Sequence, residues 1–379
     1  MRSIVFTGKG GAGASTLAAA TAVHMAESGT RTLAFGVGRG LALAFEQPLE
    51  GGPRPVAADL WAVEATPGAH DSPGPFLEWL RDLFAWRDMD ETVADDVAAL
   101  PGLVDLACLL ELDEHVESGS FDAVVLDLPA IRHSLDLLGA LDAATRALDR
   151  LLPERAPTML DPFLRALSSQ TSSGEAVYEA GRDILKRLSG LRTALGDPES
   201  ASTRLVFGGD KGSLEEARRA ITALSLYAYS VDAALCNRLT PEEAGPWTQP
   251  RREDETKALA RARESLQPLP VLPVPLAPRD VTGVEALRAL AAQAYGDRDA
   301  AAVLHRGAEQ AFSRIDGSFV LSLVIPFVER EDLAIERLDD AVIVHVGERS
   351  RTFDLPAEVQ RTAAVSSAFD GETLRVTFQ

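Results

Sequence analysis

Cysteine is scarce in this sequence: Cys108 and Cys236 are the only two in 379 residues. Two cysteines so far apart exclude a disulfide framework and a Cys-x-x-Cys zinc site, so we expect no zinc. They also cannot form the thiolate cluster that captures soft metal ions, which argues against a protein whose substrate is such an ion.

Basic residues and long apolar runs are also under-represented. The chain has 37 Lys and Arg against 57 Asp and Glu, a net charge of −20, and a pI near 4.7. This deficit of cations argues against nucleic acid and anionic lipid as partners, and we interpret the acidity as a solubility feature. No run of about 18 apolar residues occurs, and the chain enters a strand directly without a signal peptide. We therefore expect no integral membrane segment and a cytoplasmic location.

The stretch from Ser3 to Ala18 has the pattern of a phosphate-binding loop. A short apolar strand, Ile4–Phe6, leads into a glycine-rich loop and then an alanine-rich helix. In such a loop, backbone N–H groups and a helix N-terminus hold an anion. The candidate nucleotide-binding residues here are Gly8, Lys9, Gly10, Gly11, Ala12, Gly13, Ala14, Ser15 and Thr16. The pattern G-x-x-x-x-G-K-[ST] requires lysine where this chain has Ala14, so the side chain that would hold the β- and γ-phosphates is missing.

The order of strands and helices predicts an α/β fold, with a doubly wound, mostly parallel sheet followed by a small antiparallel β-sandwich. The apolar strands Ile4–Phe6 and Thr32–Phe35 flank a helix, and a βαβ unit of this length implies parallel pairing. Asp127 ends another buried strand, at the edge where α/β proteins place ligands. The expected divisions are a domain over residues 1–295 with helical insertions at about 76–118 and 134–196, a linker over 296–315, and a β-sandwich over 316–379.

Several stretches then resemble, in order, the motifs of one family. They are Gly8–Gly13 (deviant Walker A, K-G-G-x-G-K-[ST]), Leu41–Leu49 (end of switch I), Asp127–Leu135 (switch II), the run Arg204–Val206, Glu216–Arg219 and Val231–Arg238 (passage into the adenine loop), and Leu276–Leu287 (close of the domain). This is the family of arsenite-pump and tail-anchored-protein-targeting ATPases, the ArsA-like and Get-pathway proteins. The resemblance covers about residues 1–295. Residues 316–379 resemble a small-heat-shock-protein-like (α-crystallin-like) domain, through Pro326–Leu333 and Asp370–Leu374.

The resemblance implies ATP or ADP with Mg²⁺ as the ligand. Asn237 and Pro278 would then contact the nucleotide together with the loop, and Ser15 and Asp127 would hold the metal ion. Lys9 would reach across a dimer interface to the partner's phosphates, and Lys9 and Asp127 would take part in hydrolysis if the chain is active. Simpler interpretations also stand: Lys9 as a solvated loop residue, Asn237 as a turn residue, and Asp127 as a cap of the following segment.

The departures from the family pattern all remove reactive groups. The Walker lysine is Ala14, the switch I aspartate that positions the attacking water is Gly36, a second aspartate is Leu43, and the threonine after the switch II aspartate is Leu128. Phosphoryl transfer depends on positioning and charge stabilisation, and one buried lysine contributes several kcal/mol to it. Ser15, Asp127 and Asn237 remain, so the chain could still bind a nucleotide, whereas unassisted hydrolysis is not expected.

Two functional hypotheses follow. The first is a dimeric nucleotide-binding or pseudo-ATPase scaffold that handles apolar protein segments. Its partner would be a second copy or an intact paralogue, whose ATP site Lys9 would complete. The second is a competent ATPase of the targeting or anion-transport type, in which Lys9, Arg39 or a partner compensates for the missing lysine.

Overall fold

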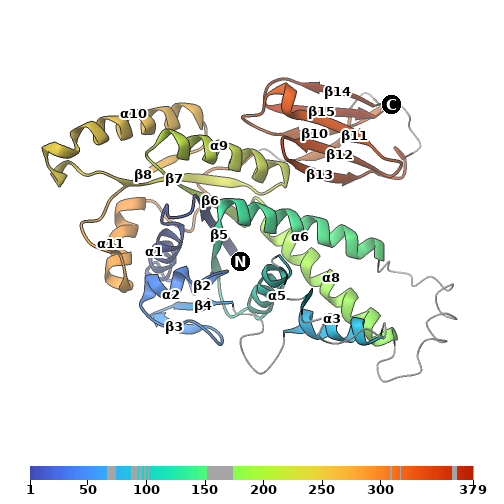
Figure 1. Ribbon diagram of the computed structural model, residues 1–379, viewed down its shortest axis with the longest axis horizontal. Helices are drawn as coiled ribbons and strands as arrows, with labels where there is room; N and C mark the ends of the chain where they lie inside the picture. Colours follow the sequence, from blue (N-terminus) through green and yellow to red (C-terminus); the bar gives the residue numbers. More distant parts are fainter. Residues whose placement is uncertain are drawn as a thin grey trace.

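The computed structural model describes residues 1–65, 74–86, 102–151, 174–307, 310–315, 317–360 and 365–378, together with residues 93, 96, 97 and 100. A large α/β unit occupies most of the chain, and a β-sandwich packs beside its helices α6 and α9 (Figure 1). The expected fold, a mostly parallel sheet followed by a small antiparallel sandwich, is confirmed.

The large sheet has eight strands in the order β3-β4-β2-β5-β1-β6-β7-β8, and every pair except β3–β4 is parallel. The strands are β1 (Arg2–Gly8), β2 (Thr32–Gly36), β3 (Arg54–Ala57), β4 (Leu60–Glu64), β5 (Ala123–Ala130), β6 (Ala201–Gly208), β7 (Val231–Leu239) and β8 (Val271–Pro275). The central strands read as continuous apolar runs because helices cover both faces of the sheet.

Helices form a layer on each face of this sheet (Figure 1). Side chains alternate along β1, so Ile4 and Phe6 join the core under one layer while Val5 joins the other. The first layer contains α1 (Ala14–Glu27), α2 (Gly40–Phe45) and α11 (Gly283–Tyr295). The second contains α3 (Pro75–Trp86), α5 (Leu103–Glu117), α6 (Ile131–Leu151), α8 (Gly174–Gly196), α9 (Lys211–Leu226) and α10 (Gln249–Ser265).

The central position of β1 determines where a ligand can bind. The chain leaves β1 toward β2 on one side, whereas β6, β7 and β8 add on the other side. Ligands of open α/β sheets bind outside the carboxyl ends of the strands at such a reversal. The loop between β1 and α1 lies at this edge, as the sequence predicts.

The C-terminal β-sandwich contains two sheets, ordered β14-β15-β10-β9 and β11-β12-β13. Its strands are β9 (Ala311–Ile315), β10 (Ser318–Val324), β11 (Leu333–Arg337), β12 (Ala341–Val346), β13 (Arg349–Asp354), β14 (Val365–Phe369) and β15 (Thr373–Phe378). Strand β9 lies within residues 296–315, the stretch expected as a linker. Leu226 of α9 is fully buried within the sandwich core, so the two units share apolar contacts.

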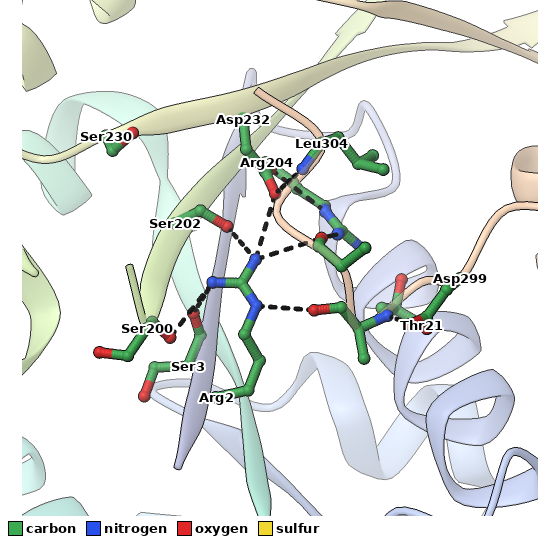
Figure 2. Close-up of polar contacts among 12 residues, drawn as sticks. Arg2, Ser3, Thr21, Ser200, Ser202, Arg204, Ser230, Asp232, Asp299 and Leu304 are labelled. Atoms are coloured by element: carbon green, nitrogen blue, oxygen red, sulfur yellow. Dashed lines mark hydrogen bonds and ion pairs between the residues drawn. The ribbon is translucent and has the colours of Figure 1, made fainter. Parts of the chain in front are cut away.

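A buried ionic cluster fixes the segment that joins the two units (Figure 2). The carboxylate of Asp232 on β7 lies 3.2 Å from Arg2 Nη2 and 3.3 Å from Arg204 Nε, and Asp232 and Arg204 are both fully buried. The two guanidiniums also donate to the carbonyls of Ala301 and Ala302, at 2.8 and 3.1 Å. The segment after α11 is thereby hydrogen-bonded to the amino ends of β1 and β6.

A second cluster connects the sandwich to the helices. Asp142 of α6 accepts from Arg146 on the same helix, Arg192 of α8 and Arg351 of β13, at 2.6 to 3.2 Å. Arg146 also donates to the Thr352 carbonyl at 2.8 Å. Because α6 begins at the carboxyl end of β5, one helix joins the ligand edge of the sheet to the sandwich.

Candidate functional site

The glycines of the β1–α1 loop serve different purposes. Gly8 ends β1 against β6, where a Cβ atom would lie only 2.1 Å from the Val206 carbonyl oxygen. Gly11 and Gly13 adopt left-handed conformations, with φ of 80° and 93°, which L side chains rarely adopt. A Cβ atom at Gly11 would meet no atom within 4 Å, whereas one at Gly13 would lie 2.6 Å from Asn237 Nδ2. The backbone therefore has the form of an anion cradle.

Alanine substitutions at Gly8 and Gly10 should separate packing from conformation. Gly8→Ala is expected to destabilise the fold by about 1–3 kcal/mol, because its Cβ would overlap a backbone oxygen of β6. Gly10→Ala should leave stability unchanged, because its Cβ would lie 3.6 Å from the nearest atom, an ordinary contact. Thermal melting of both variants checks the difference, and equal melting temperatures would contradict the geometry.

Two adjacent residues of β7 hold the loop from the side. Asn237 Nδ2 donates to the Ala12 carbonyl at 2.7 Å, and Arg238 Nη1 donates to the Gly11 carbonyl at 2.6 Å. Asn237 was predicted from the sequence as a nucleotide contact, and the structure brings it against the loop. Arg238 was not predicted, because alternation along a strand would point two successive side chains in opposite directions.

A buried carboxylate forms the floor of the site. Asp127 is 4% exposed at the end of β5, and its Oδ1 atom has no hydrogen-bond partner. Burial raises the pKa of Asp127 to about 7, a hydrogen bond from Ser15 opposes that rise, and the charge of Glu64 adds to it. The structure thus brings together Ser15 and Asp127, the two residues proposed from sequence as metal ligands.

Three strand ends lie in register across this floor. Gly36 on β2 pairs with Glu64 on β4 and with Asp127 on β5. Glu64 is buried and accepts a hydrogen bond from the Ala42 backbone at 2.8 Å, and burial raises its pKa. A Cβ atom at Gly36 would lie 3.2 Å from both Glu64 Cγ and Leu41 Cδ1. A side chain at position 36 would therefore require the Glu64 and Leu41 side chains to shift. Sequence reasoning missed Glu64, although it follows the apolar run of β4 directly.

The residues present fit a Mg²⁺ ion. The unpartnered Asp127 Oδ1 and the Ser15 hydroxyl are the hard oxygen ligands that this ion prefers. A bound Mg²⁺ would neutralise charge on the β- and γ-phosphates of a nucleotide. Gly40 packs so tightly here that a Cβ would lie 2.2 Å from Ser15 Oγ, so the first residue of α2 lies against the hydroxyl. Among the described residues, no cluster of three or more His, Cys, Asp or Glu side chains suggests another metal site.

The remaining sequence-predicted residues lie on separate segments. Lys9 is exposed, and its Nζ lies 3.5 Å from Ser213 Oγ at the start of α9. Arg39 pairs with Glu50 at 3.6 Å. Pro278 is exposed on the connection from β8 to α11. His133, within the stretch Asp127–Leu135 that resembles switch II, pairs with Asp105 of α5, with 2.5 Å between Nε2 and Oδ2.

The sequence matches two known protein-family models. The model of the anion-transporting ATPase (ArsA) family matches residues 1–296, and the model of the HSP20-like domain found in ArsA matches residues 316–378. The chain belongs to the ArsA ATPase family, and the resemblance seen in the sequence is confirmed.

Individual relatives agree with this assignment. The chain is 26% identical to a protein of Chlorobaculum tepidum named "Putative arsenical pump-driving ATPase", over 100% of this chain and 96% of that one. It is 25% identical to a similarly named protein of Aquifex aeolicus, with 95% of each chain covered. It is also 25% identical to the ATPase get3 of Schizosaccharomyces japonicus, over 76% of this chain and 90% of that one. Within the described part of the chain, no helix is both long and apolar enough to cross a membrane.

Proposed function

We propose that this chain is a dimeric, cytoplasmic nucleotide-binding scaffold that does not hydrolyse ATP unassisted. ArsA-type ATPases act through Mg²⁺ nucleotides, and this site retains the loop backbone, Ser15 and Asp127 for that ligand. It lacks the lysine at Ala14 and the aspartate at Gly36. Binding needs the cradle, whereas hydrolysis also needs charge at the transition state and an oriented water.

The main support for this proposal is the close packing of neighbouring side chains around Gly36. A Cβ atom at Gly36 would lie 3.2 Å from both Glu64 Cγ and Leu41 Cδ1, and the Glu64 carboxylate accepts a hydrogen bond from the Ala42 backbone. An aspartate at position 36 would therefore have to displace these two side chains and would add a carboxylate beside that of Glu64.

Dimerisation through the loop edge is part of the proposal. Lys9 is exposed, hydrogen-bonds only weakly to Ser213 and stands at the same edge as the loop mouth. We infer that it leaves Ser213 and reaches the phosphates of a second copy or of an intact paralogue. The HSP20-like sandwich would supply the surface for apolar protein segments. Its edge strand β9 exposes Phe312 and Ile315, and a free strand edge can pair with another chain.

Steady-state turnover of the purified full-length protein with Mg²⁺-ATP tests the proposal. We expect no turnover above background for the chain alone. Addition of an ArsA-like paralogue with an intact K-G-G-x-G-K-[ST] loop should give turnover that Lys9→Ala in this chain reduces. A robust rate from the chain alone that Lys9→Ala abolishes would contradict the proposal. It would favour the second candidate, a competent ATPase with a compensating cation.

A further inference from the structure

Three basic side chains lie near the loop that lacks its lysine. Lys9 is directed toward Ser213, and Arg39 pairs with Glu50. Arg238 instead lies on the loop itself, donating to the Gly11 carbonyl at 2.6 Å. Unlike Lys9 and Arg39, Arg238 is therefore a cation that already contacts the proposed phosphate-binding loop.

The backbone of β7 is distorted in a way that aims Arg238 at the loop. Arg238 has φ of 59°, a left-handed conformation that is uncommon outside glycine and costs about 1 kcal/mol or more. The register between β7 and β8 also shifts between Cys236 and Leu239. Such irregularities re-aim side chains beside functional sites. As a result, Asn237 and Arg238, although adjacent in a strand, both reach the same loop.

The guanidinium keeps donors free for a ligand. Nε and Nη2 of Arg238 lie 3.8 and 3.9 Å from the position that a Cβ on Gly13 would take. Arginine has five N–H donors, and the Gly11 carbonyl takes one of them. Within the described ranges no ion pair joins Arg238 to a carboxylate, and the residue is exposed. A planar group with several free donors is well suited to phosphate oxygens.

We propose that Arg238 supplies the phosphate-binding charge that the lysine of the Walker A loop would otherwise supply at position 14. A lysine there extends back over the loop to the β- and γ-phosphates. Arg238 brings its charge to the same loop from β7, so the anion cradle remains cationic although Ala14 is apolar. This inference rests on the proposed nucleotide binding and names the residue that holds its phosphates.

A double-mutant cycle between positions 14 and 238 tests the inference. The probes are fluorescent ATP and AMP analogues titrated into the full-length protein with Mg²⁺. Arg238→Gln should weaken ATP binding about tenfold to a hundredfold, the usual range for losing a charge-assisted hydrogen bond, and AMP binding much less. Ala14→Lys in the same chain should restore most of that loss. Arg261→Gln, which removes an exposed charge on α10, is the matched control and should change neither affinity.

The outcomes separate the inference from the proposed function. If wild-type protein binds ATP and Arg238→Gln binds it equally well, the assignment of Arg238 is overturned while nucleotide binding stands. If Arg238→Gln loses affinity but Ala14→Lys does not restore it, Arg238 only shapes the loop, and the assignment is again overturned. If wild-type protein binds neither nucleotide, the proposed function itself fails. Should Arg238→Gln fold poorly, Arg238→Lys must retain the preference for ATP over AMP.

Discussion

Replacing Asp232 with alanine is expected to lower the free energy of unfolding by about 3–5 kcal/mol. Asp232 is the carboxylate between Arg2 and Arg204, and Arg204 is fully buried (Figure 2). Removal of the carboxylate leaves two positive charges facing each other inside the protein. The remaining hydrogen-bond acceptors, which include the carbonyls of Ala301 and Ala302, the Ser202 hydroxyl and the Tyr295 hydroxyl, are neutral and cannot balance the two charges. Chemical denaturation followed by tryptophan fluorescence measures the change.

An exposed ion pair provides the control for Asp232. Arg31 and Asp122 form a bidentate pair at the surface, at 2.9 Å for each bond, with about half of each side chain exposed. Asp122→Ala should leave the denaturation midpoint nearly unchanged, because water screens this pair. Equal midpoints for Asp232→Ala and the wild-type protein would show that the buried cluster does not hold the segment after α11. If Asp232→Ala does not fold, Asp232→Asn should show a smaller loss with the same sign.

Replacing Asp127 with asparagine is expected to stabilise the nucleotide-free protein above neutral pH. Burial raises the pKa of Asp127 to about 7, whereas its value in the unfolded chain is near 3.8. The folded state therefore favours the protonated carboxyl. The carboxyl of Asp127 makes its full contribution to the free energy of unfolding below about pH 3.8, and this contribution is lost as the pH rises toward about 7. Asparagine cannot ionise, so it should recover on the order of 2–4 kcal/mol at about pH 8.

The measurement is thermal melting at acidic and alkaline pH. The Asp127→Asn variant should exceed wild type by several degrees on the alkaline side and match it on the acidic side. Asp280→Asn, which changes an exposed carboxylate, should show no such dependence. The same Asp127→Asn variant should lose the Mg²⁺ dependence of nucleotide binding, since its neutral amide is a poor ligand for the ion. A less stable Asp127→Asn protein at alkaline pH would mean that the ionised carboxylate stabilises the fold.

Residues that act through local chain pattern were predictable, and residues that act through tertiary contacts were not. The apolar run before Gly8 and the alanine-rich helix after Gly13 define the loop in the sequence alone. The short strands β3, β9 and β11 each lie at a sheet edge, where one-sided pairing leaves a weak apolar pattern. Arg238 was missed because its left-handed backbone breaks the alternation that sequence reasoning assumes.

The buried acids, too, could be predicted from the sequence only in part. Asp127 was found because it ends a buried strand, but the partnership with Glu64 depends on the register of β4, β2 and β5. That register places Gly36 between two carboxylates and cannot be read from spacing along the chain. Likewise Arg2, Arg204 and Asp232 lie far apart in sequence and meet only because β1, β6 and β7 are neighbours in the sheet. The order of strands, rather than any motif, creates both clusters.

The central claim is that the loop still binds a Mg²⁺ nucleotide although lysine is absent at Ala14. Isothermal titration of the full-length protein with ATP, in the presence and absence of Mg²⁺, tests it most directly. The account predicts saturable binding at micromolar to millimolar ATP that Mg²⁺ strengthens, together with a rise in melting temperature that follows occupancy. Absence of both binding heat and thermal stabilisation at millimolar ATP with Mg²⁺ would contradict it, and the loop would then be a purely structural remnant.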